Sequence, residues 1–381
     1  MNLLKRIAVP IACAMTVLAM TACSSTKDER RNPVPLTEFK PVFNVERAWK
    51  ASVGKAGRYF FSPVVVGDAV YAAGSNGTVA KIDGKTGQDI WRAKLHTDLT
   101  AGVGSDGTYT AVGAEKGGVE VIGSDGKLLW KTSVPGEIVS PPLVGNGYVI
   151  VRTIDGQISA FNASTGELRW QYRNRAVPLN LRVSAGMTFA GQVAVLAGFP
   201  GGSLAAINLK TGDDYWQAPV SFPKGVTEVE RINDVTGAPT LVGAQACAVT
   251  FQGRVSCFDA NNGQPVWEKP FSGVSGLAED NRAVVAPDDW SVLHAFDVTT
   301  GNPLWKNDKL KNRDLSAPYL LGPNVVVGDY QGYVHFLSRD DGSLLARTKT
   351  DGSAITAAPV AVDNTLIVQT HDGDLYGFVS R

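Results

Sequence analysis

The side chains best suited to catalysis or metal binding are few in this chain, and they form no recognisable site. The sequence of 381 residues contains four cysteines and four histidines, which are His96, His294, His335 and His371. No cysteine or carboxylate cluster accompanies the histidines with the spacing of a zinc site. Motifs for an activated serine, a zinc protease, a phosphate-binding loop or a calcium loop are absent. We therefore expect no catalytic residues, no metal site and no bound cofactor.

Two of the cysteines lie in an N-terminal segment that is typical of export. Basic residues precede an apolar run over Ile7–Met20, and small residues then lead directly to Cys23. This arrangement resembles a bacterial lipobox, which implies a signal peptide over residues 1–22 and lipidation of Cys23. Residues 23–41, which are polar and contain prolines, are then expected to form a flexible tether to the outer membrane. The alternative is an ordinary secretory signal that removes both Cys13 and Cys23.

The other two cysteines, Cys247 and Cys257, flank a glycine turn at Gln252-Gly253. A three-residue hairpin loop would place them directly opposite each other, whereas a two-residue loop would offset them. An exported protein permits a disulfide. A bridge and a pair of buried free thiols are both open on this spacing, and neither implies redox catalysis.

The elements that position these residues are copies of one unit. A sequence motif, Asp-Gly-Lys-Thr-Gly-Gln-Asp-Ile-Trp over Asp83–Trp91, recurs at intervals of roughly 40 residues. It ends at seven tryptophans, which are Trp49, Trp91, Trp130, Trp170, Trp216, Trp267 and Trp305. In a degenerate eighth copy, Ala346 stands at the tryptophan position. We expect the tryptophans to be buried between neighbouring units.

Each unit contains four short β-branched runs separated by turn residues, and no sustained helical period is present. The sequence therefore predicts an all-β, eight-bladed β-propeller of four-stranded antiparallel blades over residues 42–381. The copy of the motif at 43–51 has no predicted strands before it, and the predicted strands around 357–378 have no fourth strand after them. Pairing of the N- and C-terminal strands would complete the last blade and close the ring. His294 and His335 occupy equivalent third-strand positions in consecutive units and could approach each other.

Two intervals are longer than the others and mark the candidate binding face. The extra residues lie in segments 171–191 and 220–239, each between a fourth strand and the next first strand. Equivalent connections in adjacent blades emerge on the same face. Leu179, Leu181 and Arg182, beside an acidic segment that includes Asp234, have the character of an apolar anchor with a charged rim. The alternative is that the leucines pack beneath their own loop. Basic and acidic residues balance at 36 each, which gives no sign of nucleic-acid binding.

The repeat resembles that of quinoprotein alcohol dehydrogenases, which are eight-bladed propellers with a calcium-bound quinone. This chain lacks the adjacent cysteines of those enzymes and is much shorter. A periplasmic cofactor-binding propeller enzyme is therefore the alternative function, and a general peptidoglycan- or ligand-binding propeller is a further one. A shared fold does not by itself transmit an activity.

The combination of lipobox, tether, repeats and both long loops resembles the BamB family of lipoproteins of the outer-membrane β-barrel assembly machinery. That resemblance rests on Leu179-Asn-Leu181-Arg182 and on the acidic segment Thr227–Val235. It implies a non-enzymatic scaffold on the periplasmic face of the outer membrane, with BamA, other subunits of the machinery and unfolded outer-membrane proteins as partners. It further implies that Leu179, Leu181, Arg182 and Asp234 dock on a POTRA domain of BamA. Thr236 stands where the family has a second aspartate.

Overall fold

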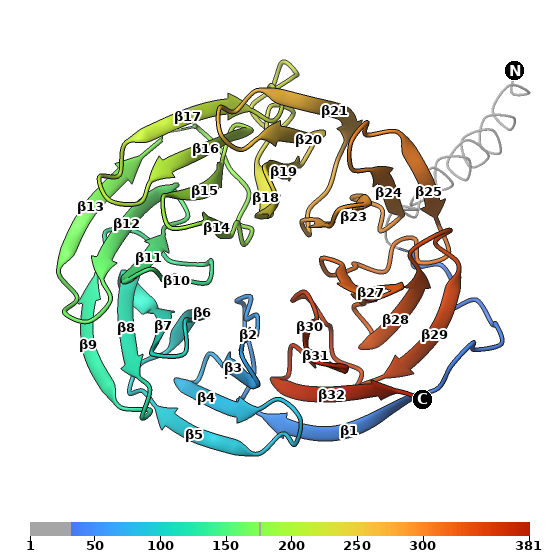
Figure 1. Ribbon diagram of the computed structural model, residues 1–381, viewed down its shortest axis with the longest axis horizontal. Coiled ribbons are helices and arrows are strands. Elements are labelled where there is room, and N and C mark those ends of the chain that lie inside the picture. The colour runs from blue at the N-terminus through green and yellow to red at the C-terminus, as the bar shows by residue number, and fades with distance from the viewer. Residues whose placement is uncertain (1–31, 175–176) are drawn as a thin grey trace, which may run out of the picture.

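A computed structural model describes residues 32–174 and 177–381 and confirms the predicted fold. Eight four-stranded antiparallel sheets are arranged as blades of one closed ring (Figure 1). Apart from the single 3-10 turn η2 (Glu115–Gly117), the described residues form strands, turns and loops. The predicted signal peptide and Cys23 lie outside the described residues.

Within a blade, the four strands follow one another in sequence from the centre of the ring to its rim (Figure 1). Blade 1 contains β2 (Val64–Val66), β3 (Ala69–Ala73), β4 (Thr78–Asp83) and β5 (Asp89–Lys94). Blade 2 contains β6 (Leu99–Ser105), β7 (Tyr109–Ala114), β8 (Gly118–Gly123) and β9 (Leu128–Ser133). Blade 3 contains β10 (Leu143–Gly145), β11 (Tyr148–Arg152), β12 (Gln157–Asn162) and β13 (Leu168–Arg173). Blade 4 contains β14 (Met187–Ala190), β15 (Ala194–Phe199), β16 (Ser203–Asn208) and β17 (Asp214–Pro219).

The second half of the ring repeats this order and is closed by the first strand of the chain. Blade 5 contains β18 (Val235–Val242), β19 (Gln245–Thr250), β20 (Gly253–Asp259) and β21 (Pro265–Phe271). Blade 6 contains β22 (Ala278–Glu279), β23 (Ala283–Pro287), β24 (Leu293–Asp297) and β25 (Pro303–Asn307). Blade 7 contains β26 (Tyr319–Leu321), β27 (Asn324–Gly328), β28 (Tyr333–Ser338) and β29 (Leu344–Lys349). Blade 8 contains β30 (Val360–Val362), β31 (Thr365–Gln369), β32 (Asp374–Ser380) and, as its outer strand, β1 (Val45–Ser52).

The recurring motif forms the turn between the third and fourth strands of a blade. In blade 1 the Asp83 carboxylate accepts hydrogen bonds from the backbone N–H groups of Lys85 at 3.0 Å and Thr86 at 2.8 Å. The bonds from Thr86 are the main reason that the pKa of Asp83 lies below its ordinary value. Gly87 closes the turn with a φ of 73°, a backbone conformation that favours glycine. The motif therefore specifies a turn through local hydrogen bonds.

The same turn joins each blade to the one before it. The turn glycine packs against the tryptophan of the preceding blade so closely that an added Cβ would lie 2.5–3.1 Å from the indole. The seven pairs are Trp49–Gly87, Trp91–Gly126, Trp130–Gly166, Trp170–Gly212, Trp216–Gly263, Trp267–Gly301 and Trp305–Gly342. Six of the indole N–H groups also donate to a carbonyl of that turn at 2.7–3.0 Å. The tryptophans thus lie between blades, as predicted.

Trp91 is the exception among the seven, because its buried indole N–H has no partner in the described part of the chain. The turn that it meets, in blade 2, closes from Gly123 to Lys127, whereas the blade 1 turn closes from Asp83 to Gln88. The blade 2 turn is therefore one residue shorter, and the carbonyl that accepts in the other blades is not presented to Trp91.

Ala346 replaces tryptophan where the ring closes. β1 pairs with β32 from Val45↔Ser380 to Ser52↔Asp374, so the predicted closure is confirmed. Blade 8 consequently has a break in the chain where the other blades have the recurring turn. Phe43 packs there instead, with its ring centroid 5.6 Å from that of Phe336, in the cluster that contains Ala346. A tryptophan at position 346 would have no turn to receive it.

The two faces of the ring differ because consecutive turns of an antiparallel blade lie at opposite ends of its strands. Turns between the first and second strands, and between the third and fourth, lie on one face. Turns between the second and third strands, together with the connections between blades, lie on the other, which we call the loop face. Both long inter-blade segments belong to the loop face.

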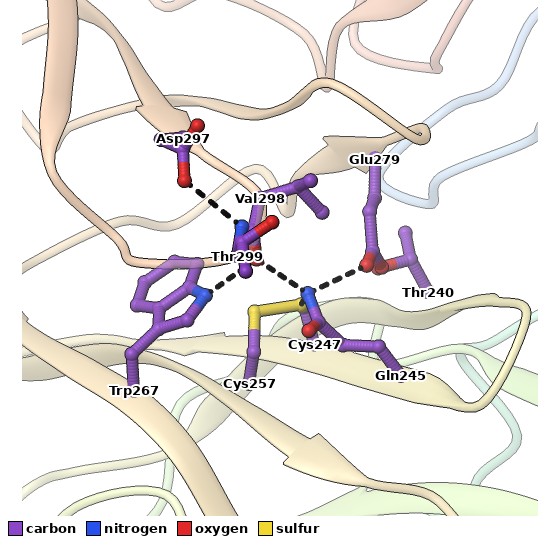
Figure 2. Close-up of a disulfide and its surroundings, with 9 residues drawn as sticks. All are labelled: Thr240, Gln245, Cys247, Cys257, Trp267, Glu279, Asp297, Val298 and Thr299. Atoms are coloured by element: carbon purple, nitrogen blue, oxygen red, sulfur yellow. Dashed lines mark hydrogen bonds between the residues drawn. A yellow bond between two sulfur atoms is a disulfide. The ribbon is translucent and has the colours of Figure 1, made fainter.

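Blades 5 and 6 meet around a disulfide and a buried carboxylate (Figure 2). Cys247 and Cys257 lie directly opposite each other in β19 and β20 and are joined by a disulfide. Gln245 of blade 5 donates to Glu279 of blade 6 at 3.1 Å, and Thr240 donates to the same carboxylate at 2.5 Å. Burial raises the pKa of Glu279 to about 7, although both hydrogen bonds lower it.

The indole hydrogen bonds predict a measurable difference between two matched substitutions. Trp91 and Trp130 are both partly buried, but only Trp130 donates to a carbonyl, that of Ala163 at 2.8 Å. Trp130→Phe should therefore lower the free energy of unfolding by about 0.5–1.5 kcal/mol more than Trp91→Phe. Urea unfolding of the two variants measures this difference. Equal losses would show that the inter-blade hydrogen bond adds nothing to the packing.

The raised pKa of Glu279 predicts a pH-dependent effect on stability. Between the ordinary value of 4.5 and about 7, the folded protein keeps a proton that the unfolded chain has released. The contribution of Glu279 is thus complete below 4.5 and is lost as the pH rises through 7. Glu279→Gln, which stays neutral, should raise the unfolding midpoint relative to the parent protein at pH 8 and change it little at pH 5. Glu167→Gln, at an exposed position, is the control; a pH-independent gain at Glu279 would contradict the assignment.

Candidate partner-binding site

The two long inter-blade segments lie side by side on the loop face and are joined by one carboxylate. Asp234, at the end of the second segment, accepts a hydrogen bond from the N–H of Leu181 in the first at 2.5 Å. Its other oxygen accepts from the N–H of Gly201, in the turn of blade 4, at 3.1 Å. Asp234 is only 3% exposed, and burial raises its pKa although both backbone donors lower it. Asp234 therefore fixes the first segment against blades 4 and 5.

A buried arginine lies beneath the hydrogen bond between Asp234 and Leu181, which we call the clasp. Arg152, at the end of β11, donates to the carbonyl of Ala185 at 3.0 Å and stands over the ring of Phe199 at 5.3 Å. Burial lowers its pKa to about 10, whereas the nearby charge of Asp234 raises it. The positive charge compensates the buried carboxylate in part, because opposite charges in a low-dielectric site stabilise each other. The clasp thus belongs to the structural core of the loop face.

The two predicted anchor leucines are held in different ways. Between them, Asn180 donates to the carbonyl of Ile154 at 3.2 Å, which pins the segment to blade 3. Leu179 is 43% exposed and lines a hollow of about 190 Å³ between the two segments, with Pro223, Glu228 and Arg231 on its other walls. Leu181 is half-buried and borders a much smaller space above Arg152. The leucines therefore do not share one surface, and Leu181 partly packs beneath its own loop.

Arg182 is exposed, but its charge is already paired within the chain. Its guanidinium donates to both carboxylate oxygens of Glu137, at 2.5 and 2.6 Å, and lies over the Tyr59 ring at 5.9 Å. These hydrogen bonds lower the pKa of Glu137 and raise that of Arg182. Glu137 and Tyr59 come from other inter-blade connections, so no local sequence pattern links them to Arg182. Sequence reasoning missed both residues.

The tip of the second segment is a rigid turn with apolar side chains in solvent. The Glu230 carboxylate accepts from the N–H groups of Val226 at 2.9 Å and Thr227 at 3.0 Å, and the Glu230 N–H is bonded to the Thr227 hydroxyl. This is a capping box, and its Thr-x-x-Glu spacing was visible in the sequence. Val226 is 95% exposed, and Phe222 and Val229 are exposed beside it. Glu230 is exposed, and its carboxylate supports the backbone that carries Val226.

The acidic half of the family pattern is inaccessible in this structure. Thr236, at the position of the second aspartate, is buried and donates to the carbonyl of Gly273 at 2.9 Å. Asp234 is buried as well. The described surface therefore offers Leu179, Arg182 and the tip of the second segment, with Asp234 below them.

The histidines predicted as neighbours each bind an aspartate of their own blade. His294 lies 3.0 Å from Asp288, and His335 lies 3.0 Å from Asp329, in both cases from a ring nitrogen to a carboxylate oxygen. Among residues 32–174 and 177–381, no three histidine, cysteine or acidic side chains are grouped as metal ligands. Within the same residues, no helix has the length and apolar character needed to span a membrane.

Comparison with known proteins assigns the chain to a family. The family model described as outer membrane protein assembly factor BamB matches residues 75–307 and 291–380. The protein of that name from Burkholderia pseudomallei is 71% identical over the full length of both chains. The crystal structure of BamB from Moraxella catarrhalis covers 88% of this chain and all of its own, with 26% identity and a TM-score of 0.80.

A quinohemoprotein alcohol dehydrogenase from Comamonas testosteroni also superposes, with a TM-score of 0.69 at 16% identity over 89% of this chain and 77% of its own. At that identity the likeness shows a shared fold alone. The relatives that match over the whole chain are named as assembly factors, in agreement with the prediction of a non-enzymatic protein. The chain therefore belongs to the BamB family of outer membrane protein assembly factors.

Proposed function

We propose that this protein is a subunit of the β-barrel assembly machinery that binds a POTRA domain of BamA through its two long loops. The observation that carries the proposal is the Asp234–Leu181 clasp, which holds the loops side by side on one face. The protein acts as a scaffold rather than an enzyme. It helps the machinery, with its other subunits, to receive or orient unfolded outer-membrane proteins. The names of its relatives support a role in outer membrane protein assembly.

Anchoring is part of the same proposal. Lipidation of Cys23 would tether the ring to the periplasmic face of the outer membrane, where BamA exposes its POTRA domains. The small residues before Cys23 and the basic and apolar residues upstream support this role. A lipidated cysteine with several acyl chains gives stable attachment, which a single chain does not.

The contact surface has an apolar centre that is organised before binding. Exposed apolar side chains gather on the two loops at Leu179, Phe222, Val226 and Val229. The backbone beneath them is fixed by the clasp and by the Glu230 cap. Binding by ordered loops costs less conformational entropy than binding by loops that must first fold. Asp234 acts as a positioning residue, since it supports the surface from below.

Truncation of the leucines tests the contact directly. Leu179→Ala combined with Leu181→Ala should weaken binding to purified BamA POTRA domains by at least about 2 kcal/mol, the usual threshold for an interface hot spot. Val193→Ala combined with Tyr215→Ala is the matched control, because both side chains are exposed on the opposite face. Calorimetric titration and thermal melting of the same samples separate affinity from stability. Unchanged affinity of the folded double leucine variant would exclude this site.

Arg182 needs a different design because it is paired with Glu137. Arg182→Glu places two carboxylates together and should weaken binding. The swap of Arg182→Glu with Glu137→Arg restores the internal ion pair but leaves a negative charge at position 182. If Arg182 meets a carboxylate of the partner, the swap should not restore binding. Full recovery by the swap would instead show that Arg182 acts only through Glu137.

A further inference from the structure

We propose that residues 32–42 form a strap that blade 7 clamps through Arg313 and Arg347, and that protonation of His335 opens this clamp. The clamp stands on geometry that is independent of the partner-binding loops. Opening the clamp would lengthen the link between the ring and its membrane anchor, and this consequence rests on the anchoring proposed above.

The strap lies along blade 7 before the chain enters β1. The N–H of Val34 donates to the carbonyl of Lys311 at 3.1 Å, and the N–H of Val42 donates to the carbonyl of Leu345, in β29, at 2.8 Å. The side chain of Asn312 donates to the carbonyl of Asn32 at 2.9 Å. Residues 32–41 belong to the segment predicted as a flexible tether, yet the strap is bonded to the ring at both of its ends.

Two arginines hold the middle of the strap. Arg313 donates to the carbonyl of Val34 at 3.2 Å, and Arg347 donates to the carbonyl of Thr37 at 3.2 Å. The Arg347 guanidinium also lies over the ring of Phe39 at 5.1 Å. The arginines thus contact the strap at two carbonyl groups and one aromatic ring. Because these contacts depend on where the guanidinium groups lie, movement of either arginine would loosen the strap.

The arginines are positioned by a buried aspartate and histidine. Arg313 forms an ion pair with Asp329 at 2.8 Å, and Asp329 lies 3.0 Å from the Nε2 atom of His335. Nε of Arg347 donates to Nδ1 of His335 at 3.2 Å. The side chains of Asp329 and His335 have no exposed surface. The strap is therefore connected to the core of blade 7 through one continuous hydrogen-bonded network.

This network requires a neutral histidine. An arginine nitrogen can only donate, so Nδ1 of His335 must accept and Nε2 must carry the proton that is donated to Asp329. Protonation would place an N–H on Nδ1 against the N–H of Arg347. It would also add a third positive charge beside Arg313 and Arg347, whereas Asp329, which is bonded to Arg313 and His335, carries the negative charge of the network. Arg347 would then have to move, and Thr37 and Phe39 would lose its contacts.

The charges around His335 set the direction of the effect. Burial lowers the pKa of His335 below 6.5; Asp329 opposes this shift, and Arg347 and Arg313 reinforce it. Because the folded-state pKa is depressed, the stabilisation is complete above pH 6.5 and declines as the pH falls below it. The ring of Tyr333 also faces His335, with its centroid 6.2 Å away. Acid therefore favours the released strap.

Release would lengthen the link between the ring and the segment that precedes residue 32. Eleven residues in an extended conformation span roughly 36 Å. A clamped strap holds an anchored ring close to its point of attachment at blade 7, and a released strap lets it move away.

Blade 6 provides an internal control. His294 lies 3.0 Å from Asp288 with the same spacing of six residues in the chain as His335 and Asp329. The His294 side chain is partly exposed, and in the described part of the chain no arginine donates to its ring. Its protonation should therefore leave the strap in place.

Hydrogen exchange of the full chain tests the proposal, with protection of the Val34 and Val42 amides expressed relative to their intrinsic rates. Between pH 7.5 and 5, protection of both amides should fall by up to about tenfold per pH unit, the limit for one linked proton. Leu196, in the core of β15, should stay protected. His335→Gln, whose amide can donate to Asp329 and accept from Arg347, should abolish the pH dependence, whereas His294→Gln should retain it.

Arg347→Met provides a second variant that keeps an apolar stem beside Phe39. It should lower strap protection at every pH and remove most of the pH dependence. The proposal is overturned if strap protection does not change with pH, if Leu196 loses protection together with the strap, or if His335→Gln still responds to acid. It is also overturned if His294→Gln abolishes the response.

Discussion

The contact between a tryptophan and the turn glycine of the next blade is the constraint on which the ring depends. The indole occupies the space that a Cβ would need, and in six of seven cases it also donates to a carbonyl of the same turn. Each blade thereby fixes the position of its neighbour, and the pairing of β1 with β32 closes the series. With the blades fixed, the connections between them have fixed starting points on the loop face.

Two of those connections are long enough to build a surface of their own. Asp234 joins them at Leu181, Arg152 partly compensates the buried charge, and Glu230 stiffens the tip that carries Val226. Asp234, Arg182 and Glu230 are thus used for support within the chain, and the exposed apolar side chains lie among the exposed charged residues Lys224, Glu228 and Arg231. That division suits a scaffold, because a site for chemistry would need reactive groups that are free to meet a substrate.

The sequence predicted the ring well because its signals are local and repeated. Turn residues, strand spacing and the tryptophan position can be read within one unit of the chain, and even Ala346 marks the place where the pattern ends. The site was predicted less completely, because its contacts join residues from different blades. Arg182 meets Glu137, and Asp234 turns inward to Leu181, although nothing near either residue in the sequence indicates these partners. The strap was missed for the same reason, since Arg313 and Arg347 lie far along the chain from Val34 and Thr37.

Site-specific photo-crosslinking tests most directly the central claim, that the loop face is the surface that meets BamA. Val226 and Val193 suit the reactive residue, because both side chains are exposed and they lie on opposite faces of the ring. A cross-link to a POTRA domain of BamA from position 226, with none from position 193, is the result expected here. A cross-link from position 193 alone, or equal cross-linking from both positions, would contradict the assignment of the binding face.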